Sequence, residues 1–363
     1  MDSATQFVLG AGVGLALLGR RIGPRKAALT GGLLATLPDL DVFIPYEDPI
    51  ESFIQHRGPT HSLIIQALVT PLFGEALLRL FKRLRDKRIL TYLAVYLCFA
   101  THALLDALTI YGTKLFWPIW NEPLGTGSVF IIDPLYTLPL LIVTVWALCL
   151  KSWSPPIRRG VHISLIISTA YLGFGLVAQQ IALSRATDAL ARHGVVPERL
   201  IATATPFNSL LWKAIAIDGD RYLNLYIPLF GGDESITSYV HSRGSDPSGC
   251  MDDRNSLGKL ARFTKGFYRV DRVGGEVIVS DLRMGMTPEY VFQFAIASQG
   301  ALGLEAIFPR RLGGINRGGR EDVDWLFANL SGDYALRPAE AGTTLARLDS
   351  WRITGAPGET ASC

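Results

Sequence analysis

The chain has 363 residues, a net charge of +3 at pH 7 and a hydrophobic fraction of 49%. That length favours two or three domains. This net charge is too small and too unlocalised to argue for nucleic-acid binding, so no nucleic-acid partner is expected.

Charge is distributed unevenly between the two halves of the chain. Residues 1–183 carry 15 Lys and Arg and 11 Asp and Glu, whereas residues 184–363 carry 20 and 21. The first half is therefore typical of a membrane domain and the second of a soluble domain. We predict a multi-pass membrane domain over 1–183 and a small soluble α+β domain over 184–363.

Six apolar stretches make up the first half, at about 6–19, 27–44, 62–81, 89–110, 129–150 and 160–183. The last three are long enough to cross a hydrocarbon core of about 30 Å, which takes roughly 20 residues. The second is the weakest, because Asp39 and Asp41 interrupt it and suggest a re-entrant segment. The pattern predicts an all-α bundle of about six transmembrane or re-entrant helices.

The charge of the links between these stretches predicts their orientation. The links at 20–26, 82–88 and 151–159 hold twelve basic residues, whereas those at 45–61 and 111–128 hold only Arg57 and Lys114. The positive-inside rule places the three basic links in the cytoplasm. Both termini and the soluble domain are then expected on the outer side of the cytoplasmic membrane.

His102 and Asp106 lie four residues apart in an apolar, helix-compatible run. Both therefore project from one helix face, about one turn apart, where they could bind one cation. The alternative is a buried His–Asp hydrogen bond without a metal. Ionisable groups inside a membrane domain are costly unless they pair, bind metal or face water.

His56 and His61 flank a Gly58-Pro59 turn, which could bring both imidazoles together. The alternative is a pair of solvated loop histidines. Arg57 lies between them, and its planar donor fork suits a phosphate or a carboxylate.

Asp39 and Asp41 follow Pro38 where the second apolar stretch ends. Their carboxylates share one face if the segment is extended and point apart if it is helical. One is then a ligand while the other orients a histidine, or both simply end a helix at the membrane interface. Asp133 stands in an Ile-Ile-Asp-Pro run, where a ligand, a base and a helix cap remain open.

Together these groups form the nitrogen and oxygen donor set that Zn²⁺, Mn²⁺ or Fe²⁺ prefers, sufficient for one or two ions. We assign as metal ligands His56, His61, His102, Asp106 and Asp41. We assign catalytic roles to Asp39, Asp133, Arg57, Tyr111 and Lys114. In this interpretation Arg57 and Lys114 hold an anion and Tyr111 donates a hydrogen bond, while metal-activated water attacks an ester, with phosphoester or lipid-linked substrates favoured.

These motifs resemble those of the YdjM/YbcI-type bacterial inner-membrane metal-dependent hydrolases, some of which are under LexA control. The resemblance rests on Leu37–Asp41, His56–Gly58, Thr60–Ser62, His102 with Asp106, Thr109, Tyr111 and Gly112, Leu115–Pro118 and Asp133-Pro134. A second patch, Asn208–Trp212 with Asp281–Gly285, is similar to a C-terminal extension of that group. The resemblance implies a multi-pass hydrolase of the inner membrane with a metal centre, but no particular substrate.

The second half is expected to fold around an antiparallel sheet after a helical segment at 184–200. Leu210–Ile217 and Arg221–Phe230 flank an Asp-Gly-Asp turn, which is a hairpin signature. Further strands are expected at Phe267–Val270, Glu276–Leu282 and Tyr290–Ala297. Arg283 could reach an anionic group, although a structural salt bridge is favoured, and Cys250 could pair with Cys363.

Two rival functions remain open. One is a metal-binding membrane protein without turnover, such as a transporter or sensor. The other is a scaffold in which buried His–Asp pairs only hold helices together. A transporter site is expected near the bilayer midplane, whereas these motifs cluster at one membrane face, which favours the hydrolase.

Overall fold

The computed structural model describes residues 1–244, 256–301, 303–313, 319–331 and 333–342, together with Thr344 and Arg347. Contacts divide the chain into two compact units, each described here by itself. The helical unit comprises Met1–Ile44, Gln55–Val177 and Ala204–Ser209. The sheet unit comprises Pro45–Ile54, Ala178–Thr203 and Leu210–Cys363. The division therefore passes through a helix between Val177 and Ala178, a few residues before the expected domain boundary at 183/184.

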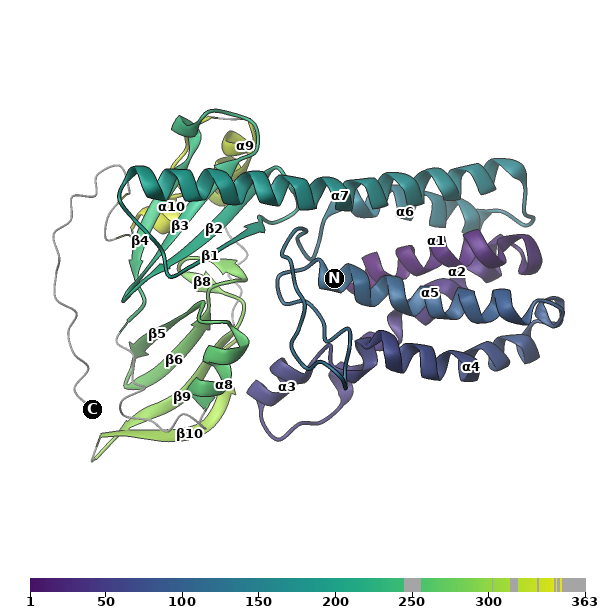
Figure 1. Cartoon of the computed structure of the whole chain (residues 1–363), viewed down its shortest axis with the longest axis horizontal. Helices are drawn as coiled ribbons and strands as arrows, with labels where there is room; N and C mark the ends of the chain where they lie inside the picture. Colours follow the sequence, from purple (N-terminus) through teal and green to yellow (C-terminus); the bar gives the residue numbers. More distant parts are fainter. Residues whose placement is uncertain are drawn as a thin grey trace. The chain divides into compact units, whose positions relative to one another are not determined.

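The helical unit contains long helices joined by short 3₁₀ turns (Figure 1). Its elements are α1 (Ser3–Ile22), α2 (Pro24–Thr36), η1 (Pro38–Phe43), η2 (Pro59–His61), α4 (Leu63–Leu80), η3 (Lys82–Leu84), α5 (Arg88–Ala107), α6 (Pro134–Cys149) and the first part of α7 (Pro155–Arg192). Buried aliphatic side chains from α1, α2, α5 and α6 form one continuous core.

Three of these helices are long and apolar enough to cross a membrane, namely α4, α5 and α7. α6 is apolar but only 16 residues long. α2 has 13 residues and ends at Thr36, because Pro38 begins the 3₁₀ turn η1. A helical N-terminal region with three candidate membrane spans is thus confirmed, whereas six crossings stay a prediction.

α1 and α2 form a helical hairpin whose close packing depends on glycine. A Cβ atom at Gly10 would lie 2.4 Å from the Gly31 carbonyl oxygen, and one at Gly14 would lie 2.5 Å from the Ala27 carbonyl oxygen. Small residues four apart let two helix backbones approach closely, which is how membrane helices associate. The glycines of the first apolar stretch therefore serve helix packing.

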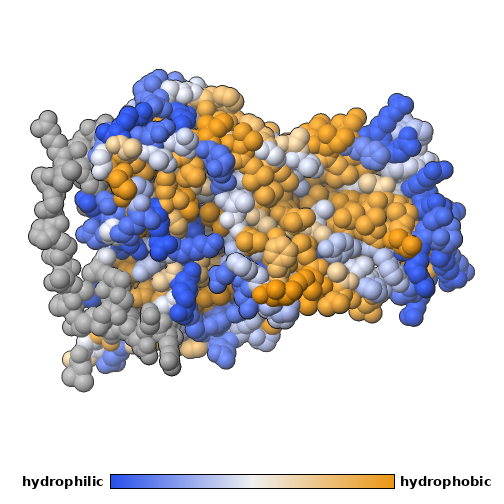
Figure 2. All heavy atoms as spheres, in the orientation of Figure 1, coloured by the Kyte–Doolittle hydropathy of each residue, from blue (hydrophilic) through white to orange (hydrophobic). Residues whose placement is uncertain are grey.

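The two ends of the helical unit differ in chemistry. The links from α1 to α2, from α4 to α5 and from α6 to α7 lie together at one end, which is hydrophilic at its surface, while the sides of the helices are apolar (Figure 2). These links contain the twelve basic residues identified in the sequence. The C-terminal ends of α2 and α5 and the N-terminal end of α4 lie at the opposite end (Figure 1).

The sheet unit is built on two four-stranded sheets, which confirms the expected antiparallel domain. The first has the order β1 (Arg199–Ala204), β2 (Leu211–Asp218), β3 (Arg221–Pro228), β4 (Thr237–Ser242). The second has the order β10 (Gly303–Arg311), β9 (Gln293–Gly300), β6 (Glu276–Asp281), β5 (Tyr268–Val273). A two-stranded ribbon pairs β7 (Gly285–Met286) with β8 (Glu289–Tyr290).

Short helices complete the sheet unit: α3 (Pro49–Gln55), η4 (Asp233–Ser235), α8 (Ser256–Phe263), α9 (Arg320–Leu330) and α10 (Pro338–Ala341). The last residue of α3, Gln55, belongs to the helical unit.

The predicted hairpin is present, with Asp218 paired to Arg221 across a two-residue turn. Gly219 has φ +59°, a left-handed conformation that glycine adopts without steric cost.

The helix expected at 184–200 is instead the end of α7, which stops at Arg192. Arg283 binds Asp281 through Nε and Nη2 at 2.7–3.2 Å and is buried, so it forms the structural ion pair. Cys250 and Cys363 lie outside the described residues.

We expect Gly31→Ala to destabilise the helical unit. The added Cβ would lie 2.1 Å from the Gly10 oxygen and 2.9 Å from the Gly14 Cα, and neither backbone atom can rotate away. Overpacking of this kind costs about 1–3 kcal/mol, so the midpoint of thermal unfolding in detergent should fall by at least about 2 °C. Gly173→Ala in α7 meets no atom within 4 Å and is the control. Equal midpoints for the two variants would contradict this packing.

Candidate metal centre

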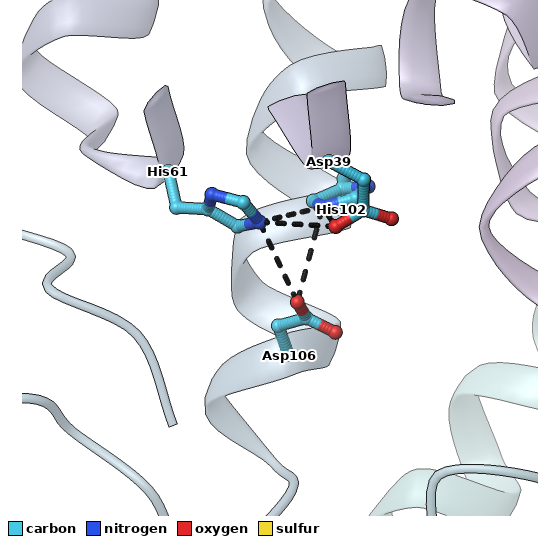
Figure 3. A group of neighbouring side chains, drawn as sticks. All are labelled: Asp39, His61, His102 and Asp106. Carbon is cyan, nitrogen blue, oxygen red and sulfur yellow. Dashed lines mark hydrogen bonds and ion pairs between the residues drawn. The ribbon is translucent and has the colours of Figure 1, made fainter. Parts of the chain in front are cut away.

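Four side chains converge at the end of the helical unit opposite the basic links. Asp39 comes from η1, His61 from η2, and His102 and Asp106 from the last turns of α5 (Figure 3). One donor atom from each residue lies within 4.8 Å of the other three. Among the described residues this is the one group of His, Cys, Asp and Glu whose donors meet in this way.

The distances within this group fit a tetrahedral ion. His61 Nε2 lies 3.0 Å from His102 Nε2, and both lie 3.4 Å from Asp39 Oδ1. Asp106 Oδ2 lies 3.6 Å from the first nitrogen and 3.9 Å from the second. Metal–ligand bonds of 2.0–2.1 Å give tetrahedron edges of about 3.3–3.4 Å. The four donors therefore surround a position that a divalent ion could occupy with small side-chain shifts.

Burial makes such an ion chemically reasonable. The side chains of His61, His102 and Asp106 are fully buried, and that of Asp39 is 20% exposed. Asp106 Oδ2 has no hydrogen bond among the described residues and faces the two imidazole nitrogens. The Arg57 guanidinium already lies against this oxygen, with Nε 2.9 Å away, so a metal ion would share it with Arg57. Asp39 is the one of these four donors that reaches solvent.

The local conformation of η1 decides the roles of the two aspartates. Residues two apart on a 3₁₀ helix point in different directions, because each turn takes three residues. Asp39 consequently faces His61 and His102, whereas Asp41 faces the 56–60 segment. The sequence left extended and helical conformations open, and the structure shows the helical one.

Asp41 fixes the orientation of His61 through a hydroxyl group. Thr60 Oγ1 donates to Asp41 Oδ2 at 3.0 Å and lies 2.9 Å from His61 Nδ1. Because the hydroxyl proton is used on Asp41, the oxygen accepts from His61 Nδ1–H. The Nε2 lone pair of neutral His61 then points into the centre, as a metal ligand requires. No such partner holds His102 Nδ1 among the described residues.

Arg57 contacts both Asp41 and Asp106, and its backbone conformation is strained. Its φ of +65° is uncommon for a residue with a Cβ. Its N–H donates to Asp41 Oδ2 at 3.0 Å, and its carbonyl accepts from Lys114 N–H at 3.1 Å. Its guanidinium places Nε 2.9 Å from Asp106 Oδ2 and donates from Nη1 to Thr109 Oγ1 at 2.9 Å. The turn thus holds a positive charge against one of the four donors.

These contacts set the electrostatics of the loop groups. Burial alone would raise the pKa of Asp41, but hydrogen bonding to His56 and the Arg57 N–H leaves it below its ordinary value. Burial lowers the pKa of His61, but Asp106 and Asp39 outweigh it and raise that pKa overall. The raised pKa of His61 reports the negative charge of the neighbouring carboxylates, which attracts a proton or a metal cation. The lowered pKa of Asp41 reports the hydrogen-bond donors and imidazoles around it.

The structure places the other predicted residues around this group. His56 and Asp41, expected among the ligands, instead bind each other, with Nδ1 2.7 Å from Oδ1. Lys114 donates from Nζ to Gln55 Oε1 at 3.0 Å, and Tyr111 lies in the same loop after α5. Asp39, expected in a catalytic role, is one of the four converging donors.

Asp133 is a helix cap. Its Oδ1 accepts from the N–H groups of Leu135 and Tyr136 at 3.0 and 3.4 Å, at the first turn of α6. Its Oδ2 accepts from Tyr171 Oη at 2.8 Å and Ser209 Oγ at 3.3 Å. Of the three roles that the sequence left open, these contacts show the cap.

Sequence reasoning assigned no role to Thr60 or Gln6. Gln6 in α1 is buried and donates from Nε2 to Asp106 Oδ1 at 3.0 Å, an oxygen that also contacts the Met1 amine. The signal for Gln6 was available, since a lone amide inside an apolar membrane helix must find a polar partner. Thr60 gives no such signal, because a threonine beside a histidine is ordinary in a loop.

Comparison with known proteins indicates that the chain is a membrane protein, which agrees with its long apolar helices. The model of the YdjM inner membrane protein family matches residues 1–182. The chain belongs to this family of inner membrane proteins. It is similar to Inner membrane protein YbcI of Escherichia coli (strain K12), with 31% identity over 148 residues, which are 40% of this chain and 78% of that protein. No solved structure matches the chain.

We expect Thr60→Val to weaken binding of Zn²⁺ while Thr60→Ser retains it. The valine keeps the branched shape but removes the hydroxyl that links Asp41 to His61. Loss of a group that orients a ligand typically lowers metal affinity about 10–100-fold. Competition with a chelating dye on the purified protein measures this difference. Equal affinity of the two variants would show that the hydroxyl does not orient His61.

Proposed function

We propose that the chain is a hydrolase of the inner membrane that cleaves an ester with a divalent metal ion held by Asp39, His61, His102 and Asp106. The observation that supports this proposal is the set of five donor–donor distances of 3.0–3.9 Å among these residues. One group of four donors suits one ion.

The donor chemistry favours zinc. Two imidazole nitrogens and two carboxylate oxygens in a tetrahedral arrangement are typical of Zn²⁺, with Mn²⁺ and Fe²⁺ as alternatives. A divalent ion in such a site supplies Lewis acidity, which polarises an ester oxygen and lowers the pKa of water to near 7. The remaining chemistry falls to residues of the chain.

His56 is placed to transfer protons. Its side chain is 37% exposed, while Asp41, which holds its Nδ1, is only 3% exposed. A carboxylate on one imidazole nitrogen fixes the tautomer and leaves the other nitrogen to exchange protons. The His56 and His61 rings lie 6.1 Å apart between centroids. We assign His56 as the general acid–base group beside the centre.

Arg57 supplies a positive charge beside the centre. Two ionised carboxylates, Asp39 and Asp106, balance the charge of a divalent ion, and both histidines are neutral when they bind it. The guanidinium beside Asp106 then favours an anionic substrate or a developing oxyanion. Lys114, in the loop that hydrogen-bonds the Arg57 carbonyl, adds to this charge.

We also propose that the centre faces the outer side of the membrane. The twelve basic residues lie at the opposite end of the helical unit, and short basic links stay in the cytoplasm. A multi-pass arrangement with six segments would then place the sheet unit in the periplasm.

A non-catalytic metal-binding protein is the alternative. Four protein donors are typical of structural zinc sites, whereas catalytic sites keep one position open. The exposure of Asp39 favours catalysis, because this donor can yield its position to water. A transporter site would lie on broken helices near the bilayer midplane, but these donors lie in η1, η2 and the last turns of α5.

Metal content and hydrolysis measured together test this function. We expect detergent-purified protein to bind about one divalent ion per chain and to cleave soluble nitrophenyl carboxylate or phosphate esters. His102→Ala should lose both properties, and His162→Ala, at an exposed position of α7, should keep both. Metal without cleavage above the His102→Ala rate would favour a transporter or sensor. Equally little metal in wild type and His102→Ala would favour the scaffold.

His56→Ala separates a proton-transfer role from a ligand role. We expect this variant to retain its metal, because His56 binds Asp41 and lies outside the donor group. Its kcat should fall about 100-fold, the usual contribution of a general acid–base group, with little change in KM. Loss of metal in His56→Ala to the same extent as in His61→Ala would make His56 a ligand instead.

A further inference from the structure

Exposed apolar side chains lie next to Asp39 in the chain and in the loop after α5. Within the helical unit, three follow the aspartates of η1 and three lie in the loop after α5: Val42, Phe43, Ile44, Phe116, Ile119 and Trp120. Phe43 is 80% exposed and Ile119 is 83% exposed. We call these six residues the apolar rim. Large exposed apolar groups that are gathered together mark a surface that meets an apolar partner.

Hydrogen bonds tie both parts of the rim to the donor residues. On one side, Val42 directly follows Asp41, which is bound to His56 and Thr60. On the other, the Leu115 carbonyl accepts from Leu63 N–H at 2.9 Å. The Trp117 carbonyl accepts from Ser62 Oγ at 2.6 Å. These bonds attach the second loop immediately after His61, so both parts of the rim flank the segment that carries a donor.

The partner that fits this rim is the lipid of the bilayer. The chain belongs to an inner-membrane family, and the exposed sides of its helical unit are apolar (Figure 2). The rim residues lie in and directly after η1 and in the loop after α5, at the end of the helical unit where α4 begins and α5 stops. Tryptophan and other aromatic residues concentrate where a membrane protein meets the headgroup region. Phe43, Phe116 and Trp120 match that composition.

Charge specifies the part of the lipid that reaches the centre. Asp39 is the partly exposed donor, and the Arg57 guanidinium places a positive charge beside Asp106. An anionic headgroup matches this charge, while an attached hydrocarbon chain matches the rim. Phosphate esters of membrane lipids combine both properties.

We propose that the substrate is a phosphate ester of a bilayer-embedded lipid, which reaches Asp39 across the apolar rim. This inference rests on the proposed hydrolase function. In the reaction a P–O bond forms to the oxygen of water, and the P–O bond to the leaving alcohol breaks. One water proton passes to the alcohol oxygen and the other remains on the phosphate product.

Phosphonates that cannot be hydrolysed test binding independently of turnover. Titration calorimetry on the zinc-loaded full-length protein in detergent compares hexadecylphosphonate with methylphosphonate, which share the anionic group. We expect the long-chain compound to bind at least about tenfold more tightly, because its chain contacts the rim. His102→Ala, which lacks the metal, should bind neither compound at this site.

Two isoleucines, one at the start of α5 and one in the loop that follows α5, provide a matched control. Ile119→Ser in the rim should lose most of the long-chain preference, and Phe43→Ser repeats the test on the other part of the rim. Ile89→Ser, at a position 85% exposed near the basic end, should keep the preference. Equal binding of the two phosphonates, or equal losses in Ile119→Ser and Ile89→Ser, would overturn the inference.

Hydrolysis distinguishes this inference from the proposed function. Cleavage of a dispersed long-chain lipid phosphate by wild type, weakened in Ile119→Ser but not in Ile89→Ser, supports both. Cleavage of soluble esters without any long-chain preference leaves the hydrolase and overturns the lipid substrate. A long-chain preference in binding without cleavage of any ester supports the lipid-phosphate site and overturns the hydrolase.

Discussion

The rest of the helical unit depends on one constraint, which is that the charge of its buried ionisable groups must be compensated. These groups are two carboxylates and two imidazoles that meet at one end of the unit. Burial of an ionised carboxylate costs several kcal/mol unless opposite charge and hydrogen bonds compensate it. Gln6 binds one oxygen of Asp106 and Arg57 lies against the other, which also faces both imidazole nitrogens. A divalent ion shared with Asp39, as proposed above, would add to this compensation.

The local irregularities of the chain follow from this requirement. Three separate segments must deliver donors to one point, so α2 gives way to a 3₁₀ turn at Pro38 and the chain turns sharply before His61. Arg57 adopts a positive φ there, and hydrogen bonds to Asp41 and from Lys114 hold that conformation. Backbone strain of this kind persists only where surrounding contacts determine it, which is common at functional sites.

Sequence patterns predicted the parts that depend on local periodicity. The spacing of His102 and Asp106 placed both on one face of α5, and the turn at Gly219 predicted the β2–β3 hairpin. The assignment of Asp39 and Asp41 depended on a 3₁₀ conformation that periodicity does not distinguish from an extended one, so their expected roles differ from their positions in the structure. β10 was not expected, because a largely exposed strand with charged residues lacks the alternation of a half-buried one. The contacts of Gln6 and Thr60 required the tertiary fold.

X-ray absorption at the zinc edge of the purified full-length protein tests the metal centre most directly. We expect two imidazole ligands and two oxygen ligands, with metal–ligand distances of about 2.0–2.2 Å. This spectrum should be unchanged in His56→Ala, because that imidazole binds Asp41 rather than the donor group. A wild-type spectrum with three imidazoles or with sulfur ligands, or loss of an imidazole in His56→Ala, would contradict the assignment of Asp39, His61, His102 and Asp106.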